Sequence, residues 1–129
     1  MTYEDRPVSV TNPSHYRSHP SGVECIDVIR HTPFNIGNAV KYLWRAGDKG
    51  GPEKLREDLE KALWYIQDAI DNNERFFAGD VNGDLLDKWS EAEPPGRRQK
   101  AITQILSGRY HTSRTTVEKW INDVLDATA

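Results

Sequence analysis

The sequence predicts an all-α protein: a small helical bundle of three core helices and a C-terminal helical pair, with an extended arm at the N-terminus. Apolar residues recur every three or four positions in several segments, as in amphipathic helices, and no segment alternates convincingly as a β-strand would. Glycine and proline gather between these segments, where the chain is expected to turn. The 129 residues are 36% hydrophobic, which suits one domain with a thin core. We therefore expect apolar patches to remain exposed on a monomer, which favours a homo-oligomer.

The N-terminal segment is predicted to hold the arm and a short helix. Residues 1–21 are polar, interrupted by prolines and without a helical period, so they suit an extended arm. Residues 23–31 are predicted to be helical, with an apolar face that holds Val23, Ile26 and either Val28 or Ile29. Thr32 followed by Pro33 is typical of the N-cap and first turn of the next helix.

The two strongest helices are predicted over residues 34–46 and 53–73. The first has one apolar stripe, made of Ile36, Val40, Leu43 and Trp44. The second keeps helical spacing along its whole length, with Leu55, Leu59, Ala62, Leu63, Ile66 and Ile70. Gly47 suits the end of the first helix, and residues 48–52 are expected to form a loop.

The C-terminal half is predicted to add the helical pair. A short helix is expected at 85–89, a boundary at 93–96, and the pair itself at 97–107 and 114–127. Thr115 and Glu118 have the spacing of a capping box, which places the start of the last helix there. We assign residues 1–75 to a helical domain with its arm, and residues 76–129 to a linker and a C-terminal helical extension of the same domain.

Charge and cysteine content exclude several classes of protein. The net charge is −3, and residues 53–93 alone carry −7, so a nucleic-acid partner is not expected even though Arg97 and Arg98 open a basic helix start. The single cysteine, Cys25, rules out an internal disulfide. No run has the length of a membrane span, and the N-terminus lacks the apolar stretch of a signal peptide. We expect a cytoplasmic protein with no membrane association.

Two short segments have residue types found in anion or metal sites. One is segment 45–51, which holds Arg45, Lys49 and three glycines. Two cations among glycines suit an anion-binding concavity. The same residues suit a helix C-cap followed by a turn, which spacing alone favours. His15 and His19 are four residues apart but flanked by prolines, so a helical metal face is not expected. We predict no metal site.

Two polar helix faces have the chemistry of a nucleotide pocket. One carries Asn38, Lys41 and Arg45 at i, i+3 and i+7, with Tyr42 beside them. The other carries Asp58, Lys61 and Tyr65 at the same spacing. Packed together, these faces would offer cations for phosphates and rings for a base. The pattern alone favours two solvated faces, because amphipathic helices normally have a charged side.

Four sequence blocks resemble a known family. They are NPSHY at 12–16, ECIDVI at 24–29, FNIGNAVKYLWRAG at 34–47 and DLEKALWY at 58–65. In this order and with these gaps, they resemble the small phage family called domain of unknown function 3310, also described as SaV-like or nucleotide kinase-like. The resemblance covers about residues 12–66 and leaves the rest of the C-terminal half unmatched.

The resemblance implies a phage protein of nucleotide metabolism in the host cytoplasm, since a family member is described as a deoxynucleoside monophosphate kinase without the usual phosphate loop. By motif position it implies catalytic roles for Lys41, Arg45, Asp58, Lys61 and His15. It implies nucleotide-binding roles for Ser14, Tyr16, Asn38, Tyr42, Lys49 and Tyr65. In our hypothesis the cations neutralise phosphates, Asp58 or His15 orients or deprotonates the accepting phosphate, and a tyrosine stacks on the base. No cofactor is required in this hypothesis.

A more distant likeness leads to a different enzyme class. Residues 57–65 are similar to a helix of MazG-like all-α nucleoside triphosphate pyrophosphatases, which bind magnesium through acidic residues of two helices. Lys61 stands where the last acidic ligand belongs, so only this alternative would need Mg²⁺. Three hypotheses remain: a nucleotide kinase, a pyrophosphatase, and a non-catalytic protein that sequesters nucleotides. A deoxynucleoside mono- or triphosphate is the expected partner in each.

Overall fold

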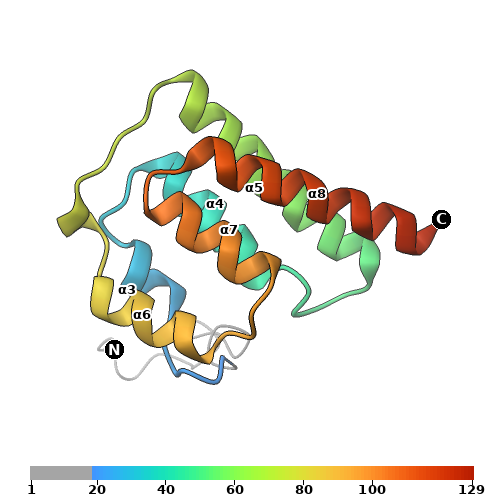
Figure 1. Cartoon of the computed structure of the whole chain (residues 1–129), viewed down its shortest axis with the longest axis horizontal. Coiled ribbons are helices and arrows are strands. Elements are labelled where there is room, and N and C mark those ends of the chain that lie inside the picture. The colour runs from blue at the N-terminus through green and yellow to red at the C-terminus, as the bar shows by residue number, and fades with distance from the viewer. Residues whose placement is uncertain (1–18) are drawn as a thin grey trace, which may run out of the picture.

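The computed structural model describes residues 19–129, which fold into a bundle of α-helices joined by short connections (Figure 1). The helices are α3 (Cys25–Ile29), α4 (Phe34–Arg45), α5 (Pro52–Asp71), α6 (Gly83–Ala92), α7 (Arg97–Leu106) and α8 (Tyr110–Thr128), with a short 3-10 helix, η2 (Ala78–Asp80), between α5 and α6. Residues 19–129 contain no strand, so the predicted all-α class is confirmed. The predicted arm lies almost entirely outside the described residues.

Four helices enclose the core. α4 packs on α5, α5 on α8, α8 on α7, and α7 back on α4, so the four close a ring. In Figure 1, α5 and α8 run side by side along the long axis, and α7 lies against α8. α3 packs on both α4 and α6 at one end of this ring. The C-terminal helical pair therefore completes the core that α4 and α5 begin.

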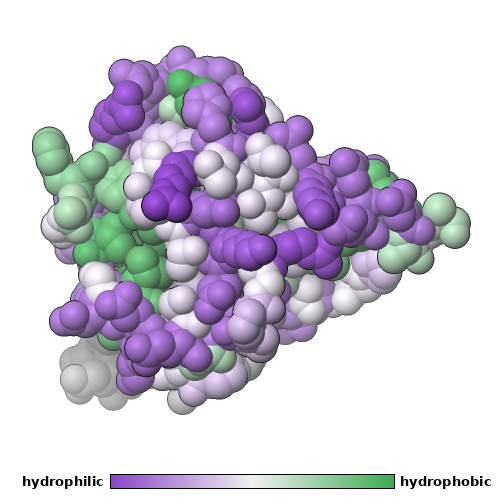
Figure 2. Space-filling view, in the orientation of Figure 1, coloured by the Kyte–Doolittle hydropathy of each residue, from purple (hydrophilic) through white to green (hydrophobic). Residues whose placement is uncertain are grey.

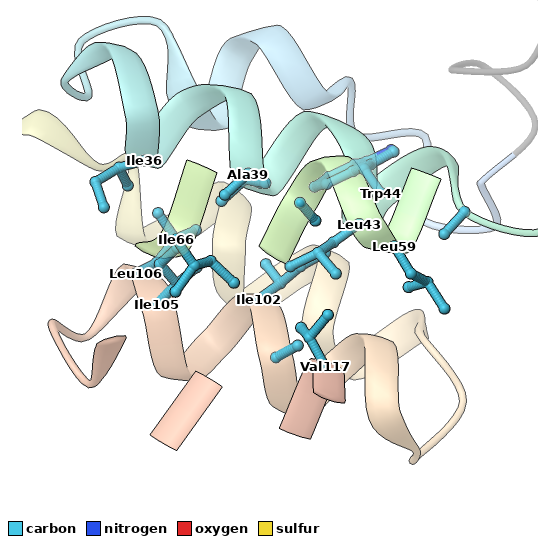
Figure 3. Close-up of a cluster of buried hydrophobic side chains, with 14 of the residues drawn as sticks. Ile36, Ala39, Leu43, Trp44, Leu59, Ile66, Ile102, Ile105, Leu106 and Val117 are labelled. Atoms are coloured by element: carbon cyan, nitrogen blue, oxygen red, sulfur yellow. The ribbon is translucent and has the colours of Figure 1, made fainter. Parts of the chain in front are cut away.

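The core is made of closely packed aliphatic and aromatic side chains. Figure 3 shows side chains of α4, α5, α7 and α8 meeting between the helices. Fully buried members include Ile36, Leu43, Leu59, Ile66, Ile102, Ile105 and Val117. Each such side chain contributes about 1.5–3 kcal/mol of hydrophobic stabilisation relative to an exposed one. Because these residues come from both halves of the sequence, their burial ties the two halves together.

The apolar stripes predicted for the two central helices are the faces that the structure buries. Every residue of the predicted α4 stripe is at most 3% exposed. On α5, Leu59, Ala62 and Ile66 are fully buried, and the remaining stripe residues pack partly buried at the edge of the core. Gly47 follows the C-cap of α4 with a φ of +86°, a left-handed conformation that glycine adopts without steric cost.

The first helix differs from its prediction. α3 is shorter than expected, and Ile26 is 48% exposed, whereas Cys25 and Val28 are buried. Thr32 does not cap α4, because its hydroxyl donates to the carbonyl of Ile29. The N-terminal turn of α4 is instead capped from a distance, since the carboxylate of Glu74 accepts a hydrogen bond from the backbone N–H of Ile36.

The last helix begins earlier than the capping-box spacing predicted. α8 starts at Tyr110, and the hydroxyl of Thr115 donates to the carbonyl of His111 inside the helix. The additional turn is stabilised by burial: Tyr110 is 8% exposed, and the fully buried Ser113 donates to the carbonyl of Ala101 on α7. Tertiary packing therefore overrode a local capping signal.

The surface in the view of Figure 2 is largely hydrophilic, with hydrophobic residues gathered at the side where the connection from α5 to α6 runs. Phe77, in that connection, is 84% exposed. Among residues 19–129, no helix combines the length and apolar character that crossing a membrane requires.

Candidate functional site

The two polar helix faces singled out in the sequence lie against each other along α4 and α5. A short loop joins these helices, so they run antiparallel, and the C-terminal end of α4 meets the N-terminal part of α5. Arg45 consequently lies opposite Asp58, while Tyr42 lies opposite Lys61 and Tyr65. The predicted residues of α4 are all half-buried, because α5 packs beside them.

Four aromatic rings form the first part of the site, which we call the aromatic cluster: Phe34 and Tyr42 of α4, and Trp64 and Tyr65 of α5. Tyr65 is its centre. Its ring stacks on Tyr42 at 5.9 Å between centroids and 10° between planes. The rings of Phe34 and Trp64 meet it nearly edge-on, at 5.9 and 5.1 Å. Phe34 is 71% exposed and Trp64 61% exposed, so the cluster presents open ring faces to solvent.

Three cations surround the ring of Tyr42. The Nζ atoms of Lys41 and Lys61 lie 4.6 and 5.4 Å from its centroid, and the Cζ of Arg45 lies at 5.9 Å. All three distances fall within the range of cation–π attraction. The aromatic part of the site is therefore continuous with a positively charged part.

Lys61 also pairs with a carboxylate of its own helix, that of Glu57. Its Nζ donates to Glu57 Oε1 at 2.7 Å, and this hydrogen bond raises the pKa of Lys61 above its ordinary value. The same bond, together with the charge of Lys54, lowers the pKa of Glu57. Both side chains are solvent-exposed, so the pair stabilises the charge of Lys61 only weakly and does not fix it rigidly.

A small cavity of about 140 Å³ lies at the end of this cationic row. We call it the α4–α5 cavity, and its lining residues are Arg45, Asp48, Lys49, Lys54 and Asp58. Three of its five charges are positive. The positive end of the α5 helix dipole also lies here, because α5 begins at Pro52.

Asp58 is the buried group of the α4–α5 cavity, with 1% of its surface exposed. Its Oδ1 lies 3.5 Å from Lys54 Nζ and 3.8 Å from Arg45 Nε. These distances allow ion pairing but are too long for hydrogen bonds, and Oδ1 accepts none within the described residues. A buried carboxyl group thus lies beside two cations while one of its oxygens keeps its hydrogen-bonding capacity.

The structure brings most of the predicted site residues together, but not all. Arg45, Lys49 and Asp58 line the α4–α5 cavity, and Lys41, Tyr42, Lys61 and Tyr65 lie along the helices beside it. Asn38 shares the face, but its amide donates to the carbonyl of Phe34 on its own helix. The predicted Ser14, His15 and Tyr16 lie outside the described residues.

Sequence reasoning missed several residues of this site. Lys54 precedes Asp58 by four positions, the spacing of a helical ion pair, so this pairing was available from the sequence. Asp48 carried no signal beyond its place in the loop. Phe34 and Trp64 were not singled out from the sequence. Trp64 is the chain neighbour of Tyr65, and only the tertiary structure shows that Phe34 of α4 meets the same ring.

Two other observations bound the chemistry of the described residues. Within residues 19–129, no group of three or more His, Cys, Asp or Glu side chains is close enough to hold a metal ion. A larger, open hollow of about 600 Å³ lies between α3 and the start of α6, lined mainly by polar residues of 27–31 and 79–85. It contains none of the predicted site residues, so volume alone does not locate the site.

Comparison with known proteins agrees with the motif blocks. No curated protein and no solved structure matches the chain. The suggested likenesses to nucleotide kinases and to MazG-like enzymes therefore stay predictions. Residues 10–67 match the model of a family described as a protein of unknown function, DUF3310, and over this segment, which holds α3, α4 and most of α5, the chain is similar to that family.

Proposed function

We propose that this protein binds a nucleotide along the α4–α5 face and transfers a phosphoryl group between nucleotides, as a phage (deoxy)nucleoside monophosphate kinase. The observation that carries this proposal is the continuity of the site. Exposed aromatic rings lead through the cations around Tyr42 to a cation-lined cavity. A nucleotide has the same order of parts, from base to phosphate.

The base end of the proposed site is the aromatic cluster. Phe34 and Trp64 offer exposed ring surface next to Tyr65, against which a base can stack. Base–aromatic stacking contributes about 1–3 kcal/mol and tolerates different bases. This end therefore supplies affinity for nucleotides as a class.

The phosphate end is the α4–α5 cavity. Its volume of about 140 Å³ is several times the ~30 Å³ that one water occupies in the liquid, which suits a phosphoryl group rather than a whole nucleotide. Arg45, Lys49 and Lys54 line it, and Arg presents a planar fork that matches phosphate oxygens. Lys41 and Lys61, farther along the face, would contact a phosphate chain that extends out of the cavity.

The proposed reaction needs little covalent help from the protein. An oxygen of the nucleoside monophosphate attacks the γ-phosphorus of a nucleoside triphosphate, the bond between that phosphorus and the β,γ-bridging oxygen breaks, and two diphosphates result. The cations neutralise the charge that spreads over the transferred group. Asp58 orients the accepting phosphate or takes its proton, because its Oδ1 has unused hydrogen-bonding capacity beside the cavity.

A product assay tests this proposal directly. The purified protein is incubated with dTMP or dGMP and ATP, with and without EDTA, and nucleotides are separated by chromatography. We expect diphosphates from both substrates. Arg45→Ala should lower the rate by ~10²–10³, the usual cost of removing a charge-stabilising group. Arg56→Ala, which changes an exposed arginine paired with Glu60 on α5 and outside the cavity lining, is the matched control.

The other outcomes each select a different function. EDTA-sensitive formation of monophosphate and pyrophosphate from a triphosphate would overturn the kinase proposal in favour of a pyrophosphatase. Retention of nucleotide without turnover would favour a sequestering protein. A protein that neither binds nor converts nucleotides would refute the assignment of this face.

A further inference from the structure

We infer that Arg98 of α7 is a positioning residue for the α4–α5 cavity, an inference that rests on the proposed function. Arg98 lies outside the segment that matches the family and outside the cavity lining. Arg98 nevertheless contacts the loop that follows α4. This loop contains two residues of the cavity lining, Asp48 and Lys49. The C-terminal half of the chain thereby contributes to the shape of a site built by the N-terminal half.

The contacts of Arg98 with this loop are specific. Its Nη2 donates to the backbone carbonyl of Ala46, the C-cap of α4, and its Nη1 lies 3.9 Å from Asp48 Oδ1. Between these two anchors stands Gly47, in its left-handed conformation. A Cβ at position 47 would lie 3.5 Å from Nη2, so the guanidinium packs directly across the glycine. Arg98 thus clamps the turn by which the chain leaves Arg45.

Arg98 also lies beside a second carboxylate, that of Glu93. Its Nη1 lies 3.6 Å from Glu93 Oε1, and the other oxygen of Glu93 accepts a 2.8 Å hydrogen bond from His19 Nε2. Glu93 is 8% exposed, and the side chain of Arg98 is 22% exposed. Glu93 therefore gives the guanidinium a mostly buried ion-pair partner in addition to Asp48.

His19 is hydrogen-bonded through both ring nitrogens. Nε2 lies 2.8 Å from Glu93 Oε2, and Nδ1 lies 2.6 Å from the hydroxyl of Ser21. The same ring stacks on Trp89 at 5.6 Å and lies 5.9 Å from Trp44. The chain segment that leads from the N-terminal residues is therefore anchored to the same carboxylate that holds Arg98.

An arginine suits position 98. Its Nη2 donates to a carbonyl while its Nη1 lies near both Asp48 and Glu93. Its neighbour Arg97 has no such role, because it pairs with Asp123 on the outer surface of α8 and lies 5.5 Å from the ring of Trp120. Arg97 therefore serves as a matched control for Arg98, because only Arg98 contacts the loop of the site.

The first test measures the opening of the loop in the ligand-free protein. Hydrogen exchange of the backbone amides of residues 46–51 is measured by mass spectrometry in the wild type, Arg98→Ala, Arg98→Lys and Arg97→Ala. We expect ~10-fold faster exchange in Arg98→Ala, an intermediate rate in Arg98→Lys and no change in Arg97→Ala. Amides in the middle of α5 serve as an internal reference that separates loop opening from global unfolding.

The second test measures ligand binding and catalysis at the site. Calorimetric titration with inorganic pyrophosphate and with dTMP should show ~10-fold weaker binding in Arg98→Ala and unchanged binding in Arg97→Ala. In the kinase assay, a positioning role predicts a higher KM for nucleotide with a smaller change in kcat, and partial rescue by Arg98→Lys. Glu93→Gln, which leaves Arg98 present but less firmly held, should act in the same direction and more weakly.

The outcomes separate this inference from the proposed function. If the wild type binds nucleotide and Arg98→Ala binds it equally well, the positioning role is overturned and the function stands. If the wild type binds neither pyrophosphate nor dTMP, the proposed function fails, and the positioning role that rests on it fails too. Unchanged exchange of residues 46–51 in Arg98→Ala overturns the positioning role whatever the binding result.

Discussion

Replacing Asp58 by asparagine changes the charge of the α4–α5 cavity while nearly preserving its shape. In the ligand-free protein the carboxylate of Asp58 forms ion pairs with two of the three cations that line the cavity. A phosphate group would have to share Lys54 and Arg45 with it. Asp58→Asn should therefore strengthen the binding of a phosphate group and, because Asp58 is proposed to orient the accepting phosphate or take its proton, slow the transfer reaction.

The size of the effect on binding follows from the distances. A phosphate between Lys54 and Arg45 would lie about 5 Å from the carboxylate, since the cations are 3.5 and 3.8 Å from Asp58 Oδ1. Repulsion between a dianion and a carboxylate at that distance is about 1.7 kcal/mol in a water-like dielectric. Asp58 is buried and both cations are only about one-third exposed, so the water-like value is the smallest repulsion expected. We expect Kd for pyrophosphate to fall by at least about tenfold.

Calorimetric titration with inorganic pyrophosphate measures this change without requiring turnover. Asp71→Asn is the matched control, because Asp71 lies exposed at the end of the same helix and accepts a hydrogen bond only from Gln67 among the described contacts. Circular dichroism at the assay temperature establishes that both variants are folded. Unchanged or weaker pyrophosphate binding in folded Asp58→Asn would refute the charge-competition argument.

Three further perturbations test other parts of the molecule. Tyr65→Leu removes the ring at the centre of the aromatic cluster and should weaken dTMP binding by about 10-fold or more while leaving pyrophosphate binding within about twofold, as measured by titration. Ile102→Ala, at a fully buried position of α7, should lower the free energy of unfolding in urea by about 2–5 kcal/mol; a loss below about 1 kcal/mol would show that α7 is not part of the main core. Burial raises the pKa of the Cys25 thiol from 9.0 to about 12, so at pH 8 the folded protein should react with a thiol reagent ~10³-fold more slowly than the protein in denaturant. Since folding favours the protonated thiol, stability should also fall as the pH rises from about 9 towards 12, and a Cys25→Ala variant should lack this part of the decline.

The local pattern of the sequence was sufficient for the central helices. The apolar residues of α4 and α5 recur with a helical period, so each helix has one apolar stripe. Such a stripe is stable only when it packs against other elements and is buried. The two polar faces followed from the same spacing, because residues at i, i+3 and i+7 lie on one side of a helix. A short loop between the helices then brings those faces together in antiparallel order.

Local patterns failed where distant contacts decide the outcome. Ile26 and Val28 are equally apolar, but only Val28 is buried, since the direction in which α3 docks selects the buried face. The capping signal at Thr115 was overridden because Tyr110 and Ser113 gain burial against the rest of the bundle when α8 starts earlier. The N-terminus of α4 is capped by Glu74, which is 38 residues away in sequence and therefore invisible to any local rule.

The sequence by itself determined the all-α class, the positions of α4 and α5, and the residue types of the candidate site, because each of these depends on side chains that are neighbours along one helix. Only the tertiary structure decided which charges meet. It set Arg45 of α4 beside Asp58 of α5, placed Phe34 and Tyr42 of α4 against Tyr65 of α5, and brought Arg98 of α7 to the loop after α4. These contacts join residues of different elements, and the ring of α4, α5, α8 and α7 around a common core is what fixes their distances.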